Sequence, residues 1–441
     1  MAVTLSLDDS NSMASSLLPI DIIASEILPR VSARSLLGFK CVCKFFKTLI
    51  SSSEFINLHL RHSQSLSSDS NRLLILLKEP SLFSVHSKTV NVVGSCNGLL
   101  CLRIRFSGNA DDSTPLVLLN PSTGIYRSIP PAWNRASLFV ENLGFGYDSE
   151  ANDYKIVQII HECRRAVMVY SLKANSWRLV EKEACPQNYI ATQVSSIGAL
   201  IDDHLFHWMC RRGSDSKYRI RCFNLRTERW GNDVPVPDCQ TTNNSKIDLG
   251  VLHGLLCLSI QYFRNGCMDL TFDVWIMKEY GVVESWTKLL SHYDDQTWMP
   301  NPIRRIFPLA YRRGSRSEVL MNQRGKLIWY NVTDKTARNA EIPGVRLPVD
   351  TYVCSGSLVG LDGGTSMLHL KQGSNTWIEL RKLWKYHMVA SKKLRYPNGP
   401  IVIPLDICFD PCVTKRIRSQ TLHTLRLMEA PNGSGTGIRN N

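Results

Sequence analysis

Apolar and polar positions alternate at helical spacing near the start of the chain. Residues 17–46 read LLPIDIIASEILPRVSARSLLGFKCVCKFF, and their first apolar positions fall on one side of a helix that Pro29 should end or kink. Ser32 can cap a second helix over residues 33–46, ARSLLGFKCVCKFF. A third helix is predicted at residues 52–60, SSEFINLHL. The pattern therefore predicts a small module of three short helices.

This helical module has more large apolar side chains than it can bury. An assembly of about 45 residues leaves much of its surface in water, so something else must cover the remainder. Two covers are possible. The helices dock on the domain that follows them in the chain, or they bind a separate protein through an apolar patch rimmed by Lys40, Lys44 and Lys47.

Beyond a Ser-rich stretch at residues 63–71, short apolar runs repeat at a regular interval. LNPSTGIY (119–126), YSLKANSW (170–177), FNLRTERW (223–230) and YNVTDKTA (330–337) each place a strand end, a polar turn and a return strand at the same offsets. VWIMKEYGVVESW (274–286) is the same unit with a longer loop. The marker positions are 51, 53, 52 and 55 residues apart: Asn120, Ser171, Asn224, Ile276 and Asn331. A period near 50 indicates a repeat architecture.

Each repeat also has an upstream apolar run with a tight turn. In CNGLLCL (96–102), Asn97 and Gly98 suit a type I′ hairpin, in which both central residues need positive φ. Four strands per repeat predict a β-propeller, and a β-sandwich is the competing all-β fold. We interpret the aromatic residue that closes each hairpin as a packing anchor between blades rather than a ligand-stacking surface: Tyr126, Trp177, Trp230 and Trp286.

The fold class is thus multidomain α+β, with a small three-helix module before an all-β propeller-like repeat domain of about five or six blades. We expect a disordered N-terminus at 1–16, the helical module at 17–62, a linker at 63–71 and the repeat domain at 72–380. MLHLKQGSNTWIEL at 367–380 echoes the repeat and predicts a further blade. The fold of the basic extension at 381–441 is not predicted.

Charge and composition limit the partners of the chain. The formal net charge is +14, and residues 361–441 hold 12 Lys or Arg against 5 Asp or Glu, which is half of that charge. We interpret this end as a solvated basic tail rather than a nucleic-acid interface. Asp8 and Asp9 stand where a signal peptide has positive charge, and no run approaches the length of a membrane span. We expect a soluble protein of the cytoplasm, the nucleus or both, with no membrane partner.

No familiar catalytic or metal-binding motif stands out. The 14 cysteines are scattered, many within apolar runs, which is typical of buried reduced thiols, and the closely spaced Cys pairs lack the second half of a zinc site. Asp148 and Asp153 are close, but Lys155 follows them, so we expect a solvated hairpin there. We predict no catalytic residues, no metal and no cofactor.

The N-terminal module resembles an F-box. The matching residues are Leu18, Pro19, Asp21, Glu26, Ile27, Leu28, Arg30, Ser35, Leu36, Leu37, Phe39, Cys41, Val42, Lys44, Leu49, Ile50, Ser52 and Phe55. Ser32 and Ser53 replace prolines common in that family, and Phe46 stands where Trp is frequent. The resemblance implies binding to a Skp-type adaptor, which couples the chain to cullin and RING subunits. The adaptor-binding residues that it implies are Leu18, Pro19, Ile22, Ile27, Leu28, Leu36, Leu37, Phe39, Cys41, Val42 and Phe46.

The repeat region resembles the F-box-associated domain of plant proteins, which is similar in architecture to kelch propellers. GSCNGLLCL, LLNPSTGIYRSIP, GFGYDSEANDYKIVQI, VMVYSLKANSWRLV, LGVLHGLLCL, DVWIMKEYGVVESWTKL and YVCSGSLV carry this resemblance. Together the two modules imply a non-catalytic substrate receptor of an SCF-type ubiquitin ligase, with propeller loops binding a target protein. The target-binding residues are not predicted. The alternative is a propeller enzyme or small-molecule sensor with its ligand in the central channel.

Overall fold

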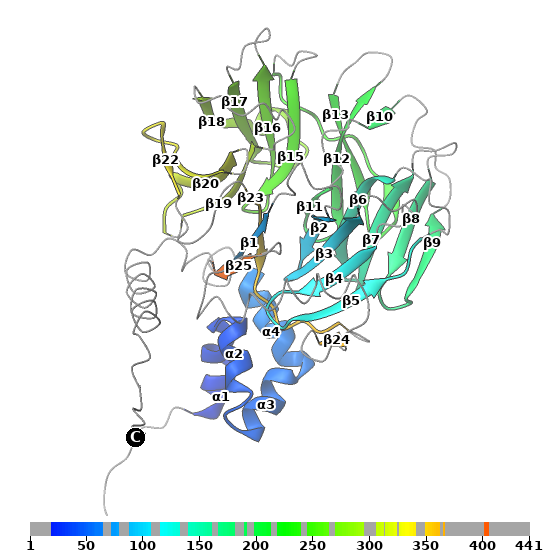
Figure 1. The fold of residues 1–441 in the computed structure, drawn as a ribbon, viewed down its shortest axis with the longest axis vertical. Helices are drawn as coiled ribbons and strands as arrows, with labels where there is room; N and C mark the ends of the chain where they lie inside the picture. Colours follow the sequence, from blue (N-terminus) through cyan, green and yellow to red (C-terminus); the bar gives the residue numbers. More distant parts are fainter. Residues whose placement is uncertain are drawn as a thin grey trace, which may run out of the picture.

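The computed structural model has a small helical module below a ring of β-sheets (Figure 1). It describes residues 19–64, 72–78, 88–106, 115–132, 140–160, 166–180, 189–191, 198–212, 218–239, 245–263, 270–294, 306–312, 314–323, 326–340, 349–361, 365–366 and 401–404. Within these residues, no helix is both long and apolar enough to cross a membrane. Residues 63 and 64 of the predicted linker belong to helix Ser53–Gln64, and the rest of that linker and the hairpin at 367–380 lie outside the described residues.

The helical module contains one irregular and three regular helical segments. The first consists of α1 (Ile20–Ile22), the π-helical η1 (Ile23–Ile27) and the 3-10 turn η2 (Leu28–Arg30). It is followed by α2 (Ala33–Phe39), α3 (Lys44–Ser51) and α4 (Ser53–Gln64). Ser32 caps α2 as predicted, because its Oγ accepts a hydrogen bond from the Ser35 amide at 3.2 Å.

The prediction of one helix over residues 33–46 is wrong. The helix ends at Phe39, and a new helix begins at Lys44, where the Cys43 Sγ accepts a hydrogen bond from the Phe46 amide at 3.5 Å. Three consecutive amides in the intervening turn bond to carbonyls three or four residues back: those of Lys40, Cys41 and Val42. The apolar pattern covers more than one stripe because it belongs to two helices with different directions.

Five antiparallel sheets form the blades of the propeller, and this confirms the predicted fold class. Blade 1 has β2 (Lys88–Cys96), β3 (Leu99–Phe106), β4 (Leu116–Asn120) and β5 (Ile125–Ile129), with β24 (Thr365–Ser366) at its edge. Blade 2 has β6 (Val140–Asp148), β7 (Asp153–Ile160), β8 (Ala166–Ser171) and β9 (Ser176–Val180). Blade 3 has β10 (Tyr189–Ala191), β11 (Ala199–Ile201), β12 (Leu205–Arg212), β13 (Tyr218–Asn224) and β14 (Arg229–Trp230).

The remaining strands complete the ring. Blade 4 has β15 (Ser245–Leu252), β16 (Leu255–Phe263), β17 (Leu270–Met277) and β18 (Trp286–Asp294), with the 3-10 turn η4 (Val283–Ser285) before β18. Blade 5 has β19 (Ile306–Tyr311), β20 (Glu318–Gln323), β21 (Lys326–Asn331) and β22 (Thr336–Asn339). A smaller closing sheet places β1 (Arg72–Lys78) between β23 (Val349–Ser355) and β25 (Ile401–Pro404).

The ring closes through its inner strands. β2 contacts β6, β6 contacts β11, β11 contacts β15, β15 contacts β19, β19 contacts β23, and β23 contacts β2. The apolar core lies between neighbouring blades, in separate clusters for blades 1 and 2, 2 and 3, 3 and 4, and 4 and 5. The closing sheet joins the start of the propeller to its end, because β1 pairs antiparallel with both β23 and β25.

The predicted repeat corresponds to one turn in each blade. Asn120, Ser171, Asn224 and Asn331 each end the third strand of a blade, and Ile276 lies one residue before the end of β17. In the three asparagine cases the Oδ1 accepts hydrogen bonds from the amides two and three residues later. Short polar side chains stabilise such turns, so a marker at this position recurs with the fold.

Two of the four hairpin aromatics, Trp177 and Trp286, bridge neighbouring blades, as predicted for packing anchors. The Trp177 Nε1 of blade 2 donates a hydrogen bond to the carbonyl of Pro130, beyond blade 1, at 2.7 Å. The Trp286 Nε1 of blade 4 donates a hydrogen bond to the carbonyl of Pro235, beyond blade 3, at 2.8 Å. Trp230 packs edge-on against Phe223 and Trp208 within blade 3.

Candidate functional site

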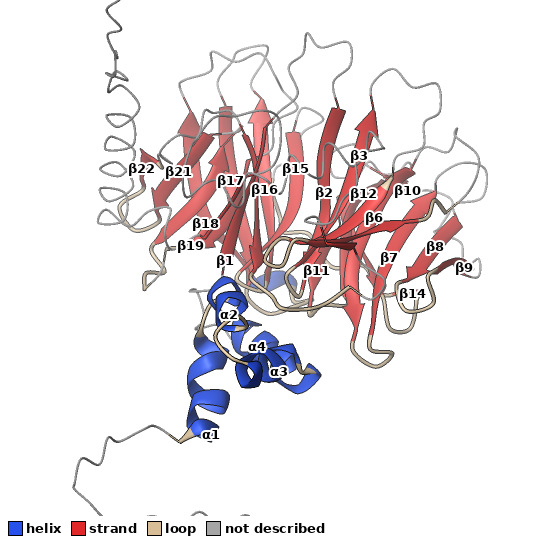
Figure 2. Ribbon diagram, turned by 60° about the horizontal axis from the view of Figure 1, so that its bottom comes forward, coloured by secondary structure: helices blue, strands red, loops and turns tan. Residues whose placement is uncertain are grey.

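The helical module exposes several large apolar side chains. Figure 2 shows the helices on the side of the sheets where the tan turns are drawn. Seven of the exposed large apolar residues described in the protein belong to this module: Ile20, Ile22, Ile27, Phe39, Val42, Phe45 and Leu58. Val42 is 66% exposed and Ile20 52% exposed. We call this set the exposed helical face. A solvent-facing patch of this kind is typical of a protein-binding surface.

The structure separates the residues predicted to bind an adaptor into groups. Pro19, Ile22, Ile27, Phe39, Cys41 and Val42 are exposed, and Leu37 and Phe46 are partly buried against the core of the module. Leu28 and Leu36 are buried at 3% and 0% exposure. Leu18 lies outside the described residues. The exposed members can meet a partner directly, whereas Leu28 and Leu36 lie in a buried cluster.

The turn between α2 and α3 brings Phe39 and Val42 together. The Val42 amide donates to the Phe39 carbonyl at 3.0 Å, so both residues lie in one tight turn. Phe45 follows in the first turn of α3, where its ring lies 5.7 Å from that of Phe46. Phe46 then reaches toward the module core, and Phe45 stays in solvent. The break that the sequence pattern did not reveal therefore contributes Phe39, Val42 and Phe45 to the exposed helical face.

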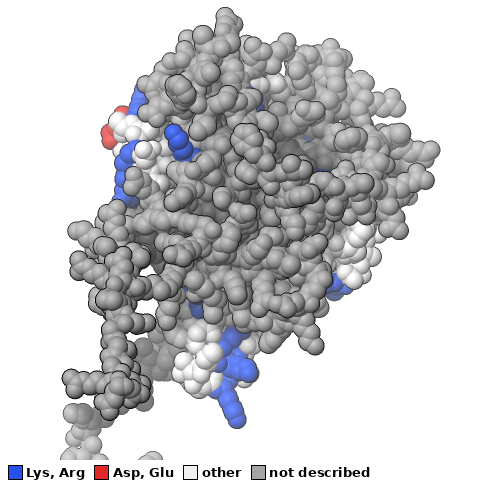
Figure 3. Space-filling view, viewed as in Figure 1, with Lys and Arg blue, Asp and Glu red and all other residues white. Residues whose placement is uncertain are grey.

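Basic side chains border this face. Lys44 and Lys47 are exposed on α3, and Lys40 is half-buried, with burial lowering its pKa. Glu26 pairs with Arg30 at 3.0 Å on the first helical segment. Figure 3 shows blue Lys and Arg atoms beside uncharged atoms at the place of the helices in Figure 1. A partner with an apolar centre and acidic rim would complement this surface.

The buried core of the module packs on the propeller. Leu358, which follows β23, lies in the same buried cluster as Leu28, Leu36, Ile50 and Phe55. The first of the two covers considered, docking on the domain that follows, is therefore present around Leu358. The propeller covers one side of the module, and the exposed helical face lies on another.

A short strap, residues 355–361, connects this contact to blade 1. The buried Asn120 Nδ2 donates to the carbonyls of Ser357 at 3.1 Å and Val359 at 2.8 Å. Ser357 in turn donates its amide to the Ser122 Oγ at 3.1 Å. Leu361 then enters the core between blades 1 and 2. The strap therefore fixes the helical module against the turns of blade 1.

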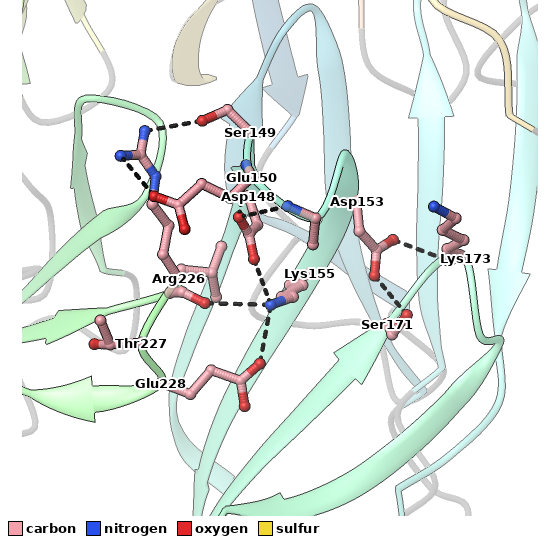
Figure 4. A network of polar contacts seen from close by, with 12 residues as sticks. Asp148, Ser149, Glu150, Asp153, Lys155, Ser171, Lys173, Arg226, Thr227 and Glu228 are labelled. Atoms are coloured by element: carbon pink, nitrogen blue, oxygen red, sulfur yellow. Dashed lines mark hydrogen bonds and ion pairs between the residues drawn. The ribbon is translucent and has the colours of Figure 1, made fainter.

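Three charged side chains of the hairpin around Asp148 are buried, contrary to the expectation of a solvated hairpin. Asp148, Asp153 and Lys155 are all less than 9% exposed. The Lys155 Nζ donates to the Asp148 Oδ2 at 2.7 Å and to the Glu228 Oε1 of blade 3 at 2.9 Å (Figure 4). Sequence reasoning missed this network because Glu228 lies 73 residues from Lys155.

The pKa directions in this network follow from its ion pairs. Burial alone would raise the pKa of Asp148, but the hydrogen bond from Lys155 and those from the Ala151 and Glu150 amides hold it below its usual value. Burial would lower the pKa of Lys155, but Asp148 and Glu228 raise it. The ion pairs of Lys155 with Asp148 and Glu228 join blades 2 and 3. Among the described residues, no cluster of His, Cys, Asp and Glu has a metal-binding arrangement.

A cavity of about 610 Å³ lies beside this network, between blades 2 and 3. Its walls include Lys155, Arg178 and Leu179 from blade 2 and Arg226 and Trp230 from blade 3. It lies between the blades, whereas the alternative interpretation of the sequence placed a ligand in the central channel. No motif signalled it, because its two walls come from separate repeats.

Comparisons with known proteins agree with this architecture. The family model described as "F-box associated beta propeller domain" matches residues 47–347. The match begins within α3, so most of the helical module precedes it. The chain is 28% identical over 394 residues to F-box protein CPR1 of Arabidopsis thaliana, covering 77% of this chain and 90% of that protein.

Two further Arabidopsis thaliana proteins give similar values. F-box/kelch-repeat protein At3g23880 is 28% identical over 304 residues, covering 62% of this chain and 79% of that protein. F-box protein At4g22390 is 25% identical over 429 residues, covering 86% of this chain and 99% of that protein. The similarity to these relatives thus extends over most of their length.

Proposed function

The chain belongs to the F-box associated β-propeller family, and on that premise we propose that it is a substrate receptor of an SCF-type ubiquitin ligase. In this proposal the helical module is an F-box that binds a Skp-type adaptor, which recruits the cullin and RING subunits. The propeller binds a target protein. Because relatives along most of the chain are named as F-box proteins, this role is supported at the level of the family.

The observation that carries the proposal is the exposed helical face. The module packs one side on the propeller through Leu358 and still leaves Val42, Phe39 and Ile20 in solvent. Isolated exposed apolar residues are ordinary, but a set concentrated on one small module needs a cover. A separate adaptor protein with an apolar groove provides that cover.

The proposed receptor is not itself the catalyst. It would bind a target and the ligase core at the same time, which raises the effective concentration of target lysines near the charged conjugating enzyme. No nucleophile in this chain is then required. We propose that this takes place in the cytoplasm, the nucleus or both, and a fluorescent fusion expressed at native level would test the location.

Copurification with a Skp-type adaptor tests the proposal. The double variant Phe39→Asp with Val42→Asp places two charges on the exposed helical face, where burial against a partner leaves them unpaired. We expect it to abolish adaptor recovery. Both side chains are exposed in the free protein, so the melting temperature should change little.

A matched control uses two exposed positions on blade 4. Val282 and Val283 are 39% and 40% exposed, so Val282→Asp with Val283→Asp adds the same charges away from the helices. This variant should bind the adaptor like the unmodified chain. Failure of the unmodified chain to recover any Skp-type protein would refute the proposal, as would equal binding by both double variants.

A further inference from the structure

Two exposed cysteines lie at the turn between α2 and α3. Cys41 and Cys43 are exposed, whereas six other cysteines of the described part of the chain are buried and Cys239 is partly buried. Burial raises the pKa of the Cys101 thiol, and it raises that of Cys354 to about 12. Exchange with a disulfide needs an accessible thiolate. Within the described residues, this turn is therefore where a thiol is open to such a reaction.

The two cysteines flank Val42, which is 66% exposed. The Cys41 amide donates a hydrogen bond to the Gly38 carbonyl at 3.0 Å, so its backbone is fixed in the turn. Cys43 immediately precedes α3, and its Sγ accepts a hydrogen bond from the Phe46 amide at 3.5 Å. Neighbouring Cα atoms are only about 3.8 Å apart. A tripeptide attached to either sulfur therefore starts one residue from Val42 and lies within the exposed helical face.

The chain around both thiols is positively charged. Residues 39–52, FKCVCKFFKTLISS, contain Lys40, Lys44 and Lys47 and no Asp or Glu. Lys44 and Lys47 are exposed, and Lys40 is half-buried. Positive charge at a surface raises the local concentration of anionic reagents. Glutathione disulfide carries more carboxylate than ammonium groups, so this charge favours it over a cationic disulfide.

A group attached at this turn would interfere with the proposed adaptor. Glutathione on Cys41 or Cys43 brings a bulky chain and carboxylates to a surface that the adaptor must cover. Burial of these carboxylates against an apolar partner would leave their charges unpaired, and the added chain would prevent close contact. The modified protein should therefore lose the adaptor, and removal of the glutathione should restore binding.

We propose that Cys41 and Cys43 form a reversible modification site at which glutathione disulfide blocks adaptor docking. The cysteine thiolate attacks one sulfur of glutathione disulfide, so a new S–S bond joins the cysteine to one glutathione and the original S–S bond breaks. The second glutathione leaves as a thiolate and takes up the proton that the cysteine released. The cysteine sulfur is oxidised, the departing glutathione is reduced, and excess glutathione thiol reverses the exchange. The effect on docking rests on the proposed function, whereas the modification itself does not.

Mapping of the modified cysteines in the full-length chain tests the site. Reduced protein is treated with glutathione disulfide or with cystamine, a disulfide that carries ammonium groups instead of carboxylates, and modified peptides are quantified by mass spectrometry. We expect the peptide with Cys41 and Cys43 to react with glutathione disulfide at least about tenfold faster than peptides with a buried cysteine. Its preference for glutathione disulfide over cystamine should shrink at high salt, because salt screens the lysine charges.

Adaptor affinity before and after treatment tests the effect on docking. The unmodified chain should lose at least about tenfold in affinity and regain it with dithiothreitol. The double variant Cys41→Ser with Cys43→Ser cannot form the adduct, so its own affinity, whatever its starting value, should change less than about twofold on treatment. Ser can cap α3 in place of Cys43, so the helix should still form. Cys239→Ser removes a partly buried thiol and should stay as sensitive as the unmodified chain.

Three results would overturn this inference. Cys41 and Cys43 could react no faster than the buried cysteines, the adduct could leave adaptor affinity unchanged, or the double variant could lose affinity on treatment as the unmodified chain does. A reduced chain that recovers no adaptor would refute the proposed function and with it the effect on docking. The mapping of modified cysteines would still decide the modification site, so the two failures are distinguishable.

Discussion

At the scale of single residues, the turn that meets the strap is the most constrained position in the described propeller turns. Asn97 and Gly98 both have positive φ, 53° and 77°, as the predicted type I′ hairpin requires. A Cβ on Gly98 would lie 2.2 Å from the Ser357 Cβ and 2.7 Å from the Ser355 carbonyl oxygen. Gly98 therefore allows the positive φ of the turn, and its lack of a Cβ leaves room for the strap.

Gly98→Ala should lower the free energy of unfolding by more than the strain of Ala at positive φ alone. Gly254 occupies the same place in blade 4, with φ 80°, but a Cβ added there would have nothing within 4 Å. Gly254→Ala should lower the free energy of unfolding by about 1 kcal/mol, because Ala is strained at positive φ. Gly98→Ala has the same strain and must also displace the strap. Denaturant unfolding of both variants measures the difference, and equal losses would contradict the role of the strap.

A buried histidine makes stability depend on pH. His207 is 0% exposed, and its Nε2 lies 2.6 Å from the Tyr280 hydroxyl, while Nδ1 faces the Ala199 carbonyl at 3.3 Å. The Nδ1 carries the proton in the neutral ring because its partner can only accept. Burial lowers the pKa of His207 to about 4. The folded protein therefore binds this proton more weakly than the unfolded chain.

Stability should fall as the pH drops through this range. The unfolded pKa is about 6.5, so the contribution of neutral His207 is complete above that pH and is lost progressively toward pH 4, about 3 kcal/mol in all. His207→Gln keeps an amide that can bond to Ala199 and Tyr280 but does not titrate. Its unfolding free energy should depend less steeply on pH between 6.5 and 4, and parallel pH profiles would show that another group is responsible.

At the scale of elements, packing and docking use different residues of the same helices. Leu36 on α2 is buried with Leu28, Ile50, Phe55 and Leu358, whereas Val42 lies in the turn at the end of α2 and is largely exposed. The sequence resemblance places both in one adaptor-binding set. Truncating each side chain should reveal the two roles separately.

Leu36→Ala should destabilise the helical module by about 2–5 kcal/mol, because it leaves a cavity in its core. Val42→Ala should change module stability by less than about 0.5 kcal/mol but weaken adaptor binding. Hydrogen exchange of α2 to α4 measures the first effect, and adaptor affinity measures the second. Normal module exchange in Leu36→Ala would contradict the packing of this side chain in the module core.

The sequence predicts the elements better than it predicts their contacts. The period near 50 residues and the turn at Asn97 identified the blades, because the strands and turns of one blade follow one another within a single repeat. The burial of Leu36 depends on Leu358, and that of Lys155 depends on Glu228, so no local pattern shows either. The break after Phe39 was also missed, since apolar residues continue through it. The cavity between blades 2 and 3 had no signal because its two walls come from separate repeats.

At the scale of the whole molecule, one strand links the helical module to ring closure. β1 follows α4 in the chain and pairs over seven residues with β23 and four with β25. The propeller therefore depends on a segment that lies next to the helical module in sequence.

Two truncations test this closure. Removing residues 1–64 deletes the helices and keeps β1, so the propeller should still unfold cooperatively. Removing residues 1–78 also deletes β1 and should lower stability by several kcal/mol, because a whole strand loses its hydrogen bonds. Thermal melts followed by near-ultraviolet circular dichroism compare the two. Equal melting temperatures would show that β1 is dispensable for closure.

The strap also has a mechanical consequence. Leu358 belongs to the helical core and Leu361 to the core between blades 1 and 2. Three residues of extended chain span only about 10 Å, so neither core can swing far without pulling on the other. The helical module and the propeller should therefore tumble in solution as one rigid body rather than as two independently moving domains. A protein that binds the helices would then set the orientation of a protein that binds the propeller.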